Sequence, residues 1–298
     1  MKEHVLIVAN RGARGYGRLG IATSVLRDFT PRVTTLDIGD YEGLEDLLAT
    51  EPRPTVVAAG GDGTLGLHVE RLRSRAVLDE VVLGLLPLGT GNDFARTVGM
   101  PLDPRQAAHA ILDGVPRALD LLVDDTGAIA VNAVHAGVGG LAALNAAPLK
   151  PWMGRMAYAV GAATAGARAT GWSVRVTVDD APVVSGRALL VGLGNGSTIG
   201  GGTLLWPRAR PDDGILEVVV ARAGGTLSRL TLAASLRRGD PGRVSDVTLT
   251  RGRSVRIEGE PMPYNADGEV RPSASARCWT VEHEAWRLIT PPSTPRTS

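Results

Sequence analysis

The stretch TVVAAGGDGTLGLHVERL, residues 55–72, reads as a buried strand, a glycine turn and an amphipathic helix. The apolar run Thr55–Ala59 predicts the strand, and Leu65, Val69 and Leu72 share one face of the helix that follows. A strand that turns directly into a helix is typical of βαβ units, whose successive strands lie parallel. This stretch therefore predicts an α/β fold.

The same glycine turn raises a question about its ligand. Residues 61–66 fit G-x-G-x-x-G, the pattern of dinucleotide-binding turns. However, Asp62 lies inside the turn, where its carboxylate would repel a bare diphosphate unless a divalent cation lay between them. The pattern also requires an acid about 20 residues on, at the end of the next strand. Asp79 and Glu80 instead precede the strand Val81–Leu86, so nicotinamide binding is disfavoured and an ordinary glycine turn stays an alternative.

Strand and helix patterns alternate over the first ~120 residues, as they do in a parallel sheet covered by helices. An Asp N-cap followed by Pro opens the last of these helices, which ends at Gly114. The predicted strands are Val5–Ala9, Val33–Ile38, Thr55–Ala59 and Val81–Leu86, and the predicted helices are Ile21–Phe29, Tyr41–Ala49, Leu65–Leu72 and one from Pro104. We expect a three-layer α/β domain over residues 1–123, to which residues 282–298 return.

The second half changes to a period of two. Residues 172–194 alternate around Asp179-Asp180, which predicts a hairpin. Further short strands are predicted at Ile215–Ala221, Val244–Leu249, Ser254–Ile257 and Cys278–Val281, with helices only at Met153–Arg168 and Leu227–Arg237. Residues 124–281 therefore predict a second, mostly antiparallel β-sandwich domain.

Composition excludes several classes of protein. A formal net charge of +1 over 298 residues argues against a nucleic-acid partner held by charge. A single cysteine, Cys278, excludes a disulfide framework and a cysteine zinc site and suits a reducing cytoplasm. The N-terminal apolar run reads as a first strand and not as a signal peptide. No stretch reaches the roughly 18 apolar residues of a membrane span, so any contact with a membrane would be at its surface.

Polar, glycine-rich loops follow three of the predicted strands, at residues 10–18 (NRGARGYGR), 60–64 (GGDGT) and 87–96 (PLGTGNDFAR). Ligands of open α/β sheets bind beyond the carboxyl ends of the strands, where these loops would meet. Free N–H groups suit phosphate, and Asp62 and Asp93 suit Mg²⁺. No Walker A lysine is present, which excludes a P-loop NTPase.

With these motifs the chain resembles the diacylglycerol kinase catalytic domain family, which includes bacterial soluble lipid kinases. The family belongs to a superfamily shared with NAD kinases and sphingosine kinases. The similarity continues through GNGSTIGGGTLLWPRARPDDGILEV (194–218) and YNADGE (264–269). It covers essentially the whole chain, and the order of the motifs makes it far more specific than one glycine pattern.

The resemblance implies a nucleotide-binding first domain and a lipid-substrate second domain, with the active site in the cleft between them. ATP and Mg²⁺ are the implied cofactors. Asp62 and Asp93 would hold the metal, and Asp120 would belong to a charge network near it. The residues implied to line the nucleotide are Asn10, Gly60, Gly61, Asp62, Gly63, Thr64, Gly89, Thr90, Asn92 and Asp93.

The late Asp-Gly-Glu motif carries the implied catalytic acids. Asp267 would be the general base that takes the proton from a lipid hydroxyl, and Glu269 its metal-binding or orienting neighbour. A carboxylate within reach of the acceptor hydroxyl is the acid/base equipment that phosphoryl transfer needs. Taken alone, Asp267-Gly268-Glu269 favours a plain hairpin turn over a catalytic motif.

Two departures from the family pattern stand out. The family opens with Asn-Pro after the first strand, whereas this chain has Asn10-Arg11. Relatives also hold a structural divalent ion where this chain has Asp213, the Ile215 carbonyl and, in the third ligand position, Arg210. Because a cation opposes a metal, we expect this ion to be weakened or absent, with the Arg210 guanidinium in the place of its charge.

The resulting expectation is a cytoplasmic, ATP- and Mg²⁺-dependent lipid kinase that acts on a diacylglycerol-like lipid. It would contact the inner face of the membrane transiently, and residues 144–161, with Trp152 beside Lys150 and Arg155, would either touch lipid or form a core helix. A homodimer is compatible with this interpretation, and the oligomeric state stays open. The alternatives are an NAD kinase, a sphingoid or ceramide kinase, a kinase of a smaller hydroxylated metabolite, or a non-catalytic nucleotide- or lipid-binding relative.

Overall fold

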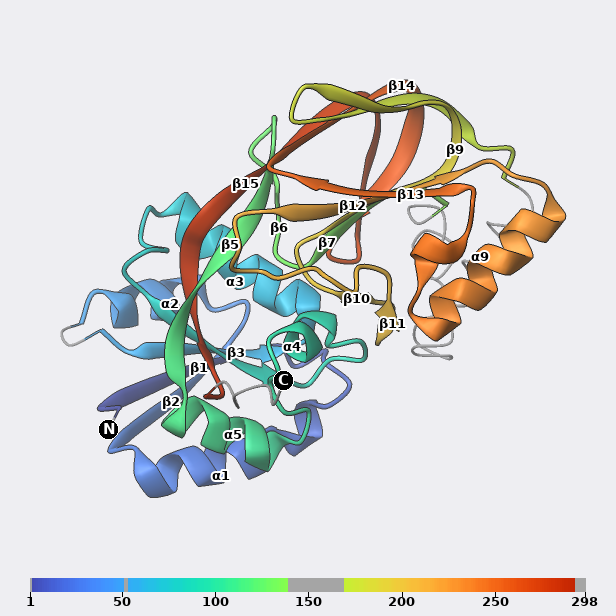
Figure 1. Cartoon of the computed structure of the whole chain (residues 1–298). Coiled ribbons are helices and arrows are strands. Elements are labelled where there is room, and N and C mark those ends of the chain that lie inside the picture. The colour runs from blue at the N-terminus through green and yellow to red at the C-terminus, as the bar shows by residue number, and fades with distance from the viewer. Residues whose placement is uncertain (1, 51–52, 139–168, 293–298) are drawn as a thin grey trace. The chain divides into compact units, whose positions relative to one another are not determined.

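The computed structural model describes residues 2–50, 53–138 and 169–292, and the chain divides into two compact units. Unit 1 comprises Met1–Leu119 and Glu284–Ser298, and unit 2 comprises Asp120–His283. Figure 1 shows the elements of both units. The division after Leu119 lies four residues before the predicted end of the first domain at residue 123.

Unit 1 is built on a parallel sheet in the order β4-β3-β1-β2. The end of β15 adds to it in parallel, where Arg287 and Leu288 pair with β4. The central strands are buried along almost their whole length, which explains their continuous apolar runs. The strands are β1 (His4–Ala9), β2 (Arg32–Asp37), β3 (Thr55–Gly60), β4 (Val82–Pro87) and β15 (Glu269–Thr290).

Helices cover both faces of this sheet. Right-handed crossovers put α1 on one face and α2 and α3 on the other, and α5 packs beside α1 (Figure 1). Asp40 caps α2 and Asp103 caps α5 through side-chain hydrogen bonds, as the Asp103-Pro104 pair predicts. The helices are α1 (Leu19–Phe29), α2 (Tyr41–Leu48), α3 (Asp62–Ser74), α4 (Asp93–Thr97) and α5 (Pro104–Asp113), with a 3₁₀ turn η1 (Tyr16–Arg18) before α1.

The order of the strands creates a switch point beside β1. Strands β2 and β3 lie on opposite sides of β1, so the chain leaves β1 and β3 in opposite directions. In such sheets the diverging loops open a crevice at the carboxyl ends of the strands. This topology places the loops after Ala9 and Gly60 on the two sides of that point.

Unit 2 is mostly antiparallel, in the order β13-β12-β9-β7-β14, with β8 paired to both β9 and β14 and β15 paired to β14. The predicted hairpin is confirmed: Asp179 and Asp180 both have positive φ, at 46° and 63°, between β8 and β9. The elements are β5 (Val115–Asp124), β6 (Ile129–Ala130), β7 (Ala133–Gly137), β8 (Trp172–Val178), β9 (Ala181–Gly194), β10 (Thr198–Ile199), β11 (Thr203–Leu204), β12 (Leu216–Arg222), α9 (Thr226–Arg238), η3 (Pro241–Arg243), β13 (Val247–Gly252) and β14 (Ser254–Ala266).

Two sequence-based expectations differ from these elements. The strand predicted at Cys278–Val281 is a small part of β15, which runs for 22 residues. Its partner changes from β14 to β4 along the chain, so it shows no single apolar pattern. The helix predicted at Leu65–Leu72 begins three residues earlier, at Asp62, so the second half of GGDGT is already helical. The predicted helix Met153–Arg168 lies outside the described residues.

The buried core of unit 2 is aliphatic, with a few large aromatic side chains. Trp206 packs over β9, where a Cβ added at Gly194 would lie 2.3 Å from its ring. Gly192 is restricted in the same way, at 2.9 Å, so this strand needs glycine to accommodate the indole. Within the described part of the chain, no helix has the length and apolarity to cross a membrane.

Candidate functional site

The glycine turns after β3 and β4 are in direct contact. A Cβ added at Gly89 would lie 2.3 Å from the Cα of Gly61, and one added at Gly60 would lie 2.3 Å from Oγ1 of Thr64. The Gly60 carbonyl accepts hydrogen bonds from the N–H groups of Leu88 and Gly89, at 2.8 and 3.1 Å. Only glycine permits such an approach of two backbones. The two turns therefore form one continuous backbone surface.

The loop after β1 joins this surface. Nδ2 of Asn10 donates to Oγ1 of Thr64 at 3.2 Å, and the N–H of Gly15 donates to the Leu88 carbonyl at 2.9 Å. The Oδ1 of Asn10 accepts from the N–H of Gly12 at 2.8 Å. Asn10 thus shapes its own loop and ties it to the start of α3. The three loops that the sequence placed after separate strands converge within unit 1.

Asp62 connects two of these loops through its carboxylate. Its Oδ2 accepts from the N–H of Asp93 and its Oδ1 from the N–H of Phe94, both at 3.0 Å. The carboxylate therefore caps the N-terminus of α4 from a distant part of the chain. Burial, with the charge of Asp93 as a second cause, raises the pKa of Asp62 to about 6 against the effect of these hydrogen bonds. A cation beside the two acids would favour their charged forms.

The N-terminus of α3 differs from those of α2, α4 and α5, because no side chain caps it. Its N-cap is Gly61, and Gly63 lies in the first turn with nothing within 4 Å of a Cβ built there. Uncapped N–H groups and the positive end of the helix dipole attract anions such as phosphate. The first turn of α3 therefore offers an open approach for a phosphate group.

Thr90 and Asn92 have different environments in the second loop. Asn92 is buried in a left-handed conformation, with φ of 54°, and its Nδ2 donates to the carbonyls of Pro87 and Gly89 at 3.3 and 3.0 Å. Asn92 thus holds the backbone of the turn. Thr90 is exposed and accessible to a ligand.

In unit 2, Asp267 occupies the turn between β14 and β15. Both Asp267 and Gly268 have positive φ, at 50° and 87°, which is the geometry of a type I′ hairpin. The Asp267 carboxylate accepts hydrogen bonds from the N–H groups of Val131, Asn132 and Ala133, at 2.5, 2.9 and 2.9 Å. Both of its oxygens are therefore engaged by backbone donors.

Glu269, two residues later, is in a more open environment. Its side chain is 58% exposed, and its Oε2 lies 3.3 Å from Nη2 of Arg271. Of the two acids of the Asp-Gly-Glu turn, Glu269 is the more exposed. Asp267 holds the turn to the backbone of residues 131–133.

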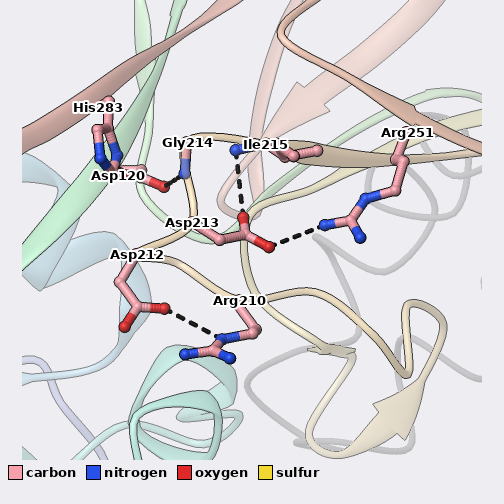
Figure 2. A network of polar contacts seen from close by, with 8 residues as sticks. All are labelled: Asp120, Arg210, Asp212, Asp213, Gly214, Ile215, Arg251 and His283. Carbon is pink, nitrogen blue, oxygen red and sulfur yellow. Dashed lines mark hydrogen bonds and ion pairs between the residues drawn. The ribbon is translucent and has the colours of Figure 1, made fainter.

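Asp120 is buried and joins two further parts of unit 2. Its Oδ2 accepts from the N–H of Gly214 at 2.7 Å, and its Oδ1 lies 2.7 Å from Nδ1 of His283. Figure 2 shows Asp120 with both partners. Gly214 has φ of 69°, and a Cβ there would lie 3.2 Å from Nδ1 of His283. Asp120 therefore holds the turn at Gly214 against β15.

The segment implied to bind a structural ion does not fit a divalent cation. Nη2 of Arg251 lies 2.8 Å from Oδ2 of Asp213, and Oδ1 of Asp213 accepts from the N–H of Ile215 at 3.2 Å (Figure 2). The Arg251 guanidinium thus pairs with the Asp213 carboxylate, which a metal ion would need as a ligand. The expectation that Arg210 would supply this charge was wrong, because Arg210 faces Asp212, at 3.4 Å.

The described residues contain no group of three or more histidine, cysteine, aspartate or glutamate side chains that could hold a metal ion. Asp62 and Asp93 form a pair only. Mg²⁺ at nucleotide sites is commonly held by one or two carboxylates, with phosphate oxygens and water as the other ligands. This pair therefore fits the Mg²⁺ of a nucleotide complex.

Sequence reasoning missed His283, Arg251 and the backbone of residues 131–133. His283 lies 163 residues from Asp120, and Val131 lies 136 residues from Asp267. No local sequence pattern identifies these residues, because strand pairing or a turn brings each of them to its partner. The segment 144–161, considered for lipid contact, lies outside the described residues.

The comparisons with known proteins agree with this arrangement. The fold matches a crystal structure titled as a diacylglycerol kinase from Bacillus anthracis str. Sterne, with a TM-score of 0.78 and 23% identity, over 98% of each chain. Two family descriptions match the sequence: "Diacylglycerol kinase catalytic domain" over residues 4–123 and "YegS C-terminal NAD kinase beta sandwich-like domain" over residues 132–290. The fold is therefore that of the diacylglycerol kinase family.

The chain belongs to the diacylglycerol kinase catalytic domain family of lipid kinases. It is 34% identical over 277 residues to "Probable lipid kinase YegS-like" of Pseudomonas aeruginosa PAO1, covering 88% of this chain and 89% of that protein. It is 29% identical over 239 residues to "Diacylglycerol kinase" of Mycobacterium tuberculosis H37Rv, covering 78% and 76%.

Proposed function

We propose that this chain is an ATP- and Mg²⁺-dependent lipid kinase that transfers the γ-phosphoryl group to the hydroxyl of a diacylglycerol-like lipid. The observation that carries the proposal is the convergence of three loops on the uncapped N-terminus of α3. The names of the two relatives, lipid kinase and diacylglycerol kinase, support the choice of acceptor.

The nucleotide phosphates would lie against the glycine surface of unit 1. Phosphoryl transfer needs positioning and charge neutralisation more than covalent chemistry. Backbone N–H groups at Gly63 and Thr64 point from the first turn of α3, and the Thr90 hydroxyl borders the neighbouring turn. Mg²⁺ bound with the nucleotide neutralises phosphate charge, and Asp62 and Asp93 are the acids that would hold it.

The Asp-Gly-Glu turn would supply the base, with the roles divided between its two acids. Three N–H groups donate to the two oxygens of Asp267 and hold this carboxylate in place. Glu269 is exposed, and its carboxylate lies beside Arg271. We therefore assign proton removal from the acceptor hydroxyl to Glu269 and positioning of the turn to Asp267, the reverse of the roles that the sequence suggested.

A diacylglycerol-like acceptor resides in a membrane, so the protein would reach it by transient contact with the membrane surface. Flotation of the purified chain with vesicles measures this contact directly. We expect binding to vesicles that contain the acceptor lipid and release when ATP and Mg²⁺ allow turnover to proceed. A chain that does not float with acceptor-containing vesicles in the absence of ATP would contradict this part of the proposal.

A transfer assay with labelled ATP tests the function. The purified chain is supplied with Mg²⁺ and, in separate reactions, vesicles containing diacylglycerol, ceramide or a sphingoid base, and NAD in solution. We expect label in the diacylglycerol product and none with Glu269→Gln. Label in NAD alone would contradict the assignment of a lipid acceptor. If ATP binds but none of the four acceptors is labelled, the result would favour a non-catalytic relative or a kinase of a smaller metabolite.

A further inference from the structure

In unit 2, the guanidinium of Arg251 on β13 contacts Asp213, a residue that the resemblance implies as a ligand of a structural ion in relatives. We propose that the guanidinium of Arg251 replaces a divalent cation at Asp213, so that unit 2 holds the segment 210–217 without metal. Arg251 is then a positioning residue that acts on the turn through Asp213. This inference is independent of the function proposed above, because it concerns contacts within unit 2 alone.

The position of Arg251 is set by strand pairing. Arg251 on β13 pairs in register with Glu217 on β12, so its backbone is held by the antiparallel ladder. Its Nη2 lies 2.8 Å from Oδ2 of Asp213, and its Nε lies 3.5 Å from Oε1 of Glu217. A planar guanidinium presents donors in fixed directions and can bridge two carboxylates in this way. One arginine therefore joins the turn to the neighbouring strand.

Guanidinium groups already pair with the carboxylates at this turn. Arg251 pairs with Asp213 and Glu217, and Arg210 pairs with Asp212. A divalent cation at Asp213 would place two further positive charges within a few ångströms of the Arg251 guanidinium. Repulsion between charges of the same sign is strong at such short distances. The site therefore disfavours a metal ion on electrostatic grounds.

Glu217 is buried and depends on these arginines. Burial raises its pKa above the ordinary value of a glutamate, and the charges of Arg251 and Arg208 act in the opposite direction. A buried carboxylate that remains charged needs a cation beside it. Arg251 meets this need for Glu217 and for Asp213 at the same time.

The turn that Arg251 holds leads to Asp120. Asp213 precedes Gly214, whose N–H donates to the buried carboxylate of Asp120, which in turn contacts His283 (Figure 2). The side chain of Asp213 also accepts from the N–H of Ile215, which shapes the turn on the other side of Gly214. Removing Arg251 would therefore loosen the position of the Gly214 N–H against Asp120.

Thermal unfolding of the full chain tests the proposal. The Tm is measured by fluorimetry without nucleotide, once in EDTA and once in millimolar MgCl₂ or CaCl₂. The proteins are wild type, Asp213→Asn, Arg251→Gln and, as a matched control, Arg243→Gln. Arg243 forms an exposed ion pair with Asp240 in the same unit. The first readout is the metal-induced change in Tm of the wild type minus that of Asp213→Asn, which cancels any metal bound elsewhere.

We expect this difference to be zero within error. We further expect Arg251→Gln to lower the Tm in EDTA by roughly 2–4 °C, the scale of about 1 kcal/mol in a chain of this size, and Arg243→Gln to leave it unchanged. A metal-induced stabilisation that Asp213→Asn removes would overturn the proposal. So would an Arg251→Gln protein whose Tm equals that of the Arg243→Gln control. If Arg251→Gln does not fold, the comparison of wild type with Asp213→Asn decides alone.

Discussion

The backbone N–H of Phe94 donates a 3.0 Å hydrogen bond to Oδ1 of Asp62, which lies 32 residues earlier in the chain. The other oxygen of the same carboxylate accepts from the N–H of Asp93. The acid that the sequence marked as a candidate metal ligand is thus also the residue that ties the two glycine loops together. Changes at Asp62 should therefore affect stability as well as catalysis.

Asp62→Ala should lower the free energy of unfolding by about 1–3 kcal/mol, because two N–H groups at the start of α4 lose their acceptor. Urea unfolding of the full chain measures this. Asp46→Ala, an exposed substitution in α2, is the control and should stay within about 0.5 kcal/mol of the wild type. Equal stabilities of the two variants would contradict the role assigned to Asp62 in holding the loops.

The raised pKa of Asp62 predicts a dependence of stability on pH. Its folded-state pKa of about 6 exceeds the ordinary value of 3.8, so its contribution to stability is fully present below about pH 3.8 and is lost as pH rises through about 6. The stability of the wild type minus that of Asp62→Asn should therefore increase, by about 1–3 kcal/mol, as pH falls through this window.

Urea unfolding of both proteins at several pH values gives this difference. The comparison cancels the opposite effect of His68, whose pKa burial lowers to about 4 and which both proteins share. A difference that is flat from pH 7 to pH 4 (roughly the window set by these values) would show that Asp62 titrates normally.

Two alanine substitutions separate the role of glycine in packing from its role in binding. Gly63→Ala lies in the first turn of α3 with open space around the new methyl group, so it should leave stability unchanged or raise it by about 0.5–1 kcal/mol. It should nevertheless weaken ATP binding, because the methyl group would project where phosphate approaches. Titration calorimetry with ATP and Mg²⁺ checks this, and unchanged affinity would place the phosphates elsewhere.

Gly89→Ala should instead destabilise unit 1 itself. The added Cβ would lie 2.3 Å from the Cα of Gly61, a backbone atom that cannot rotate away. We expect a loss of about 1–3 kcal/mol of unfolding free energy, measured by urea unfolding. Gly20→Ala, with nothing within 4 Å of its Cβ, is the control and should show no loss.

Substitutions of the two acids of the Asp-Gly-Glu turn should affect different properties, activity for one and stability for the other. Glu269→Gln should reduce kcat by about 10²–10⁴-fold, the usual contribution of a general base, with stability and ATP affinity near those of the wild type. Asp267→Asn should lower stability by about 1–3 kcal/mol, since a neutral amide cannot accept from all three N–H groups. Steady-state kinetics and urea unfolding of both variants give the answer. An Asp267→Asn protein that is as stable as the wild type but has no transfer activity would indicate that Asp267, and not Glu269, is the general base.

Much of the fold could be predicted from local pattern. The apolar runs of β1, β3 and β4 marked buried parallel strands, and Asp179-Asp180 marked a hairpin. Such signals are readable because side-chain periodicity and turn conformation depend on residues a few positions apart. The length of β15 was not predicted, since it exchanges one partner strand for another along its course.

The candidate site divides in the same way. The sequence by itself determined the glycine turns, their acids and the Asp-Gly-Glu hairpin, because these depend on which residues permit a backbone conformation and carry charge. Only the tertiary structure decided that Asp62 caps α4, that three N–H groups hold Asp267, and that Arg251 and not Arg210 pairs with Asp213. Each of these partners is chosen by the register of strands and the packing of loops far apart in the chain, and no local pattern encodes that choice.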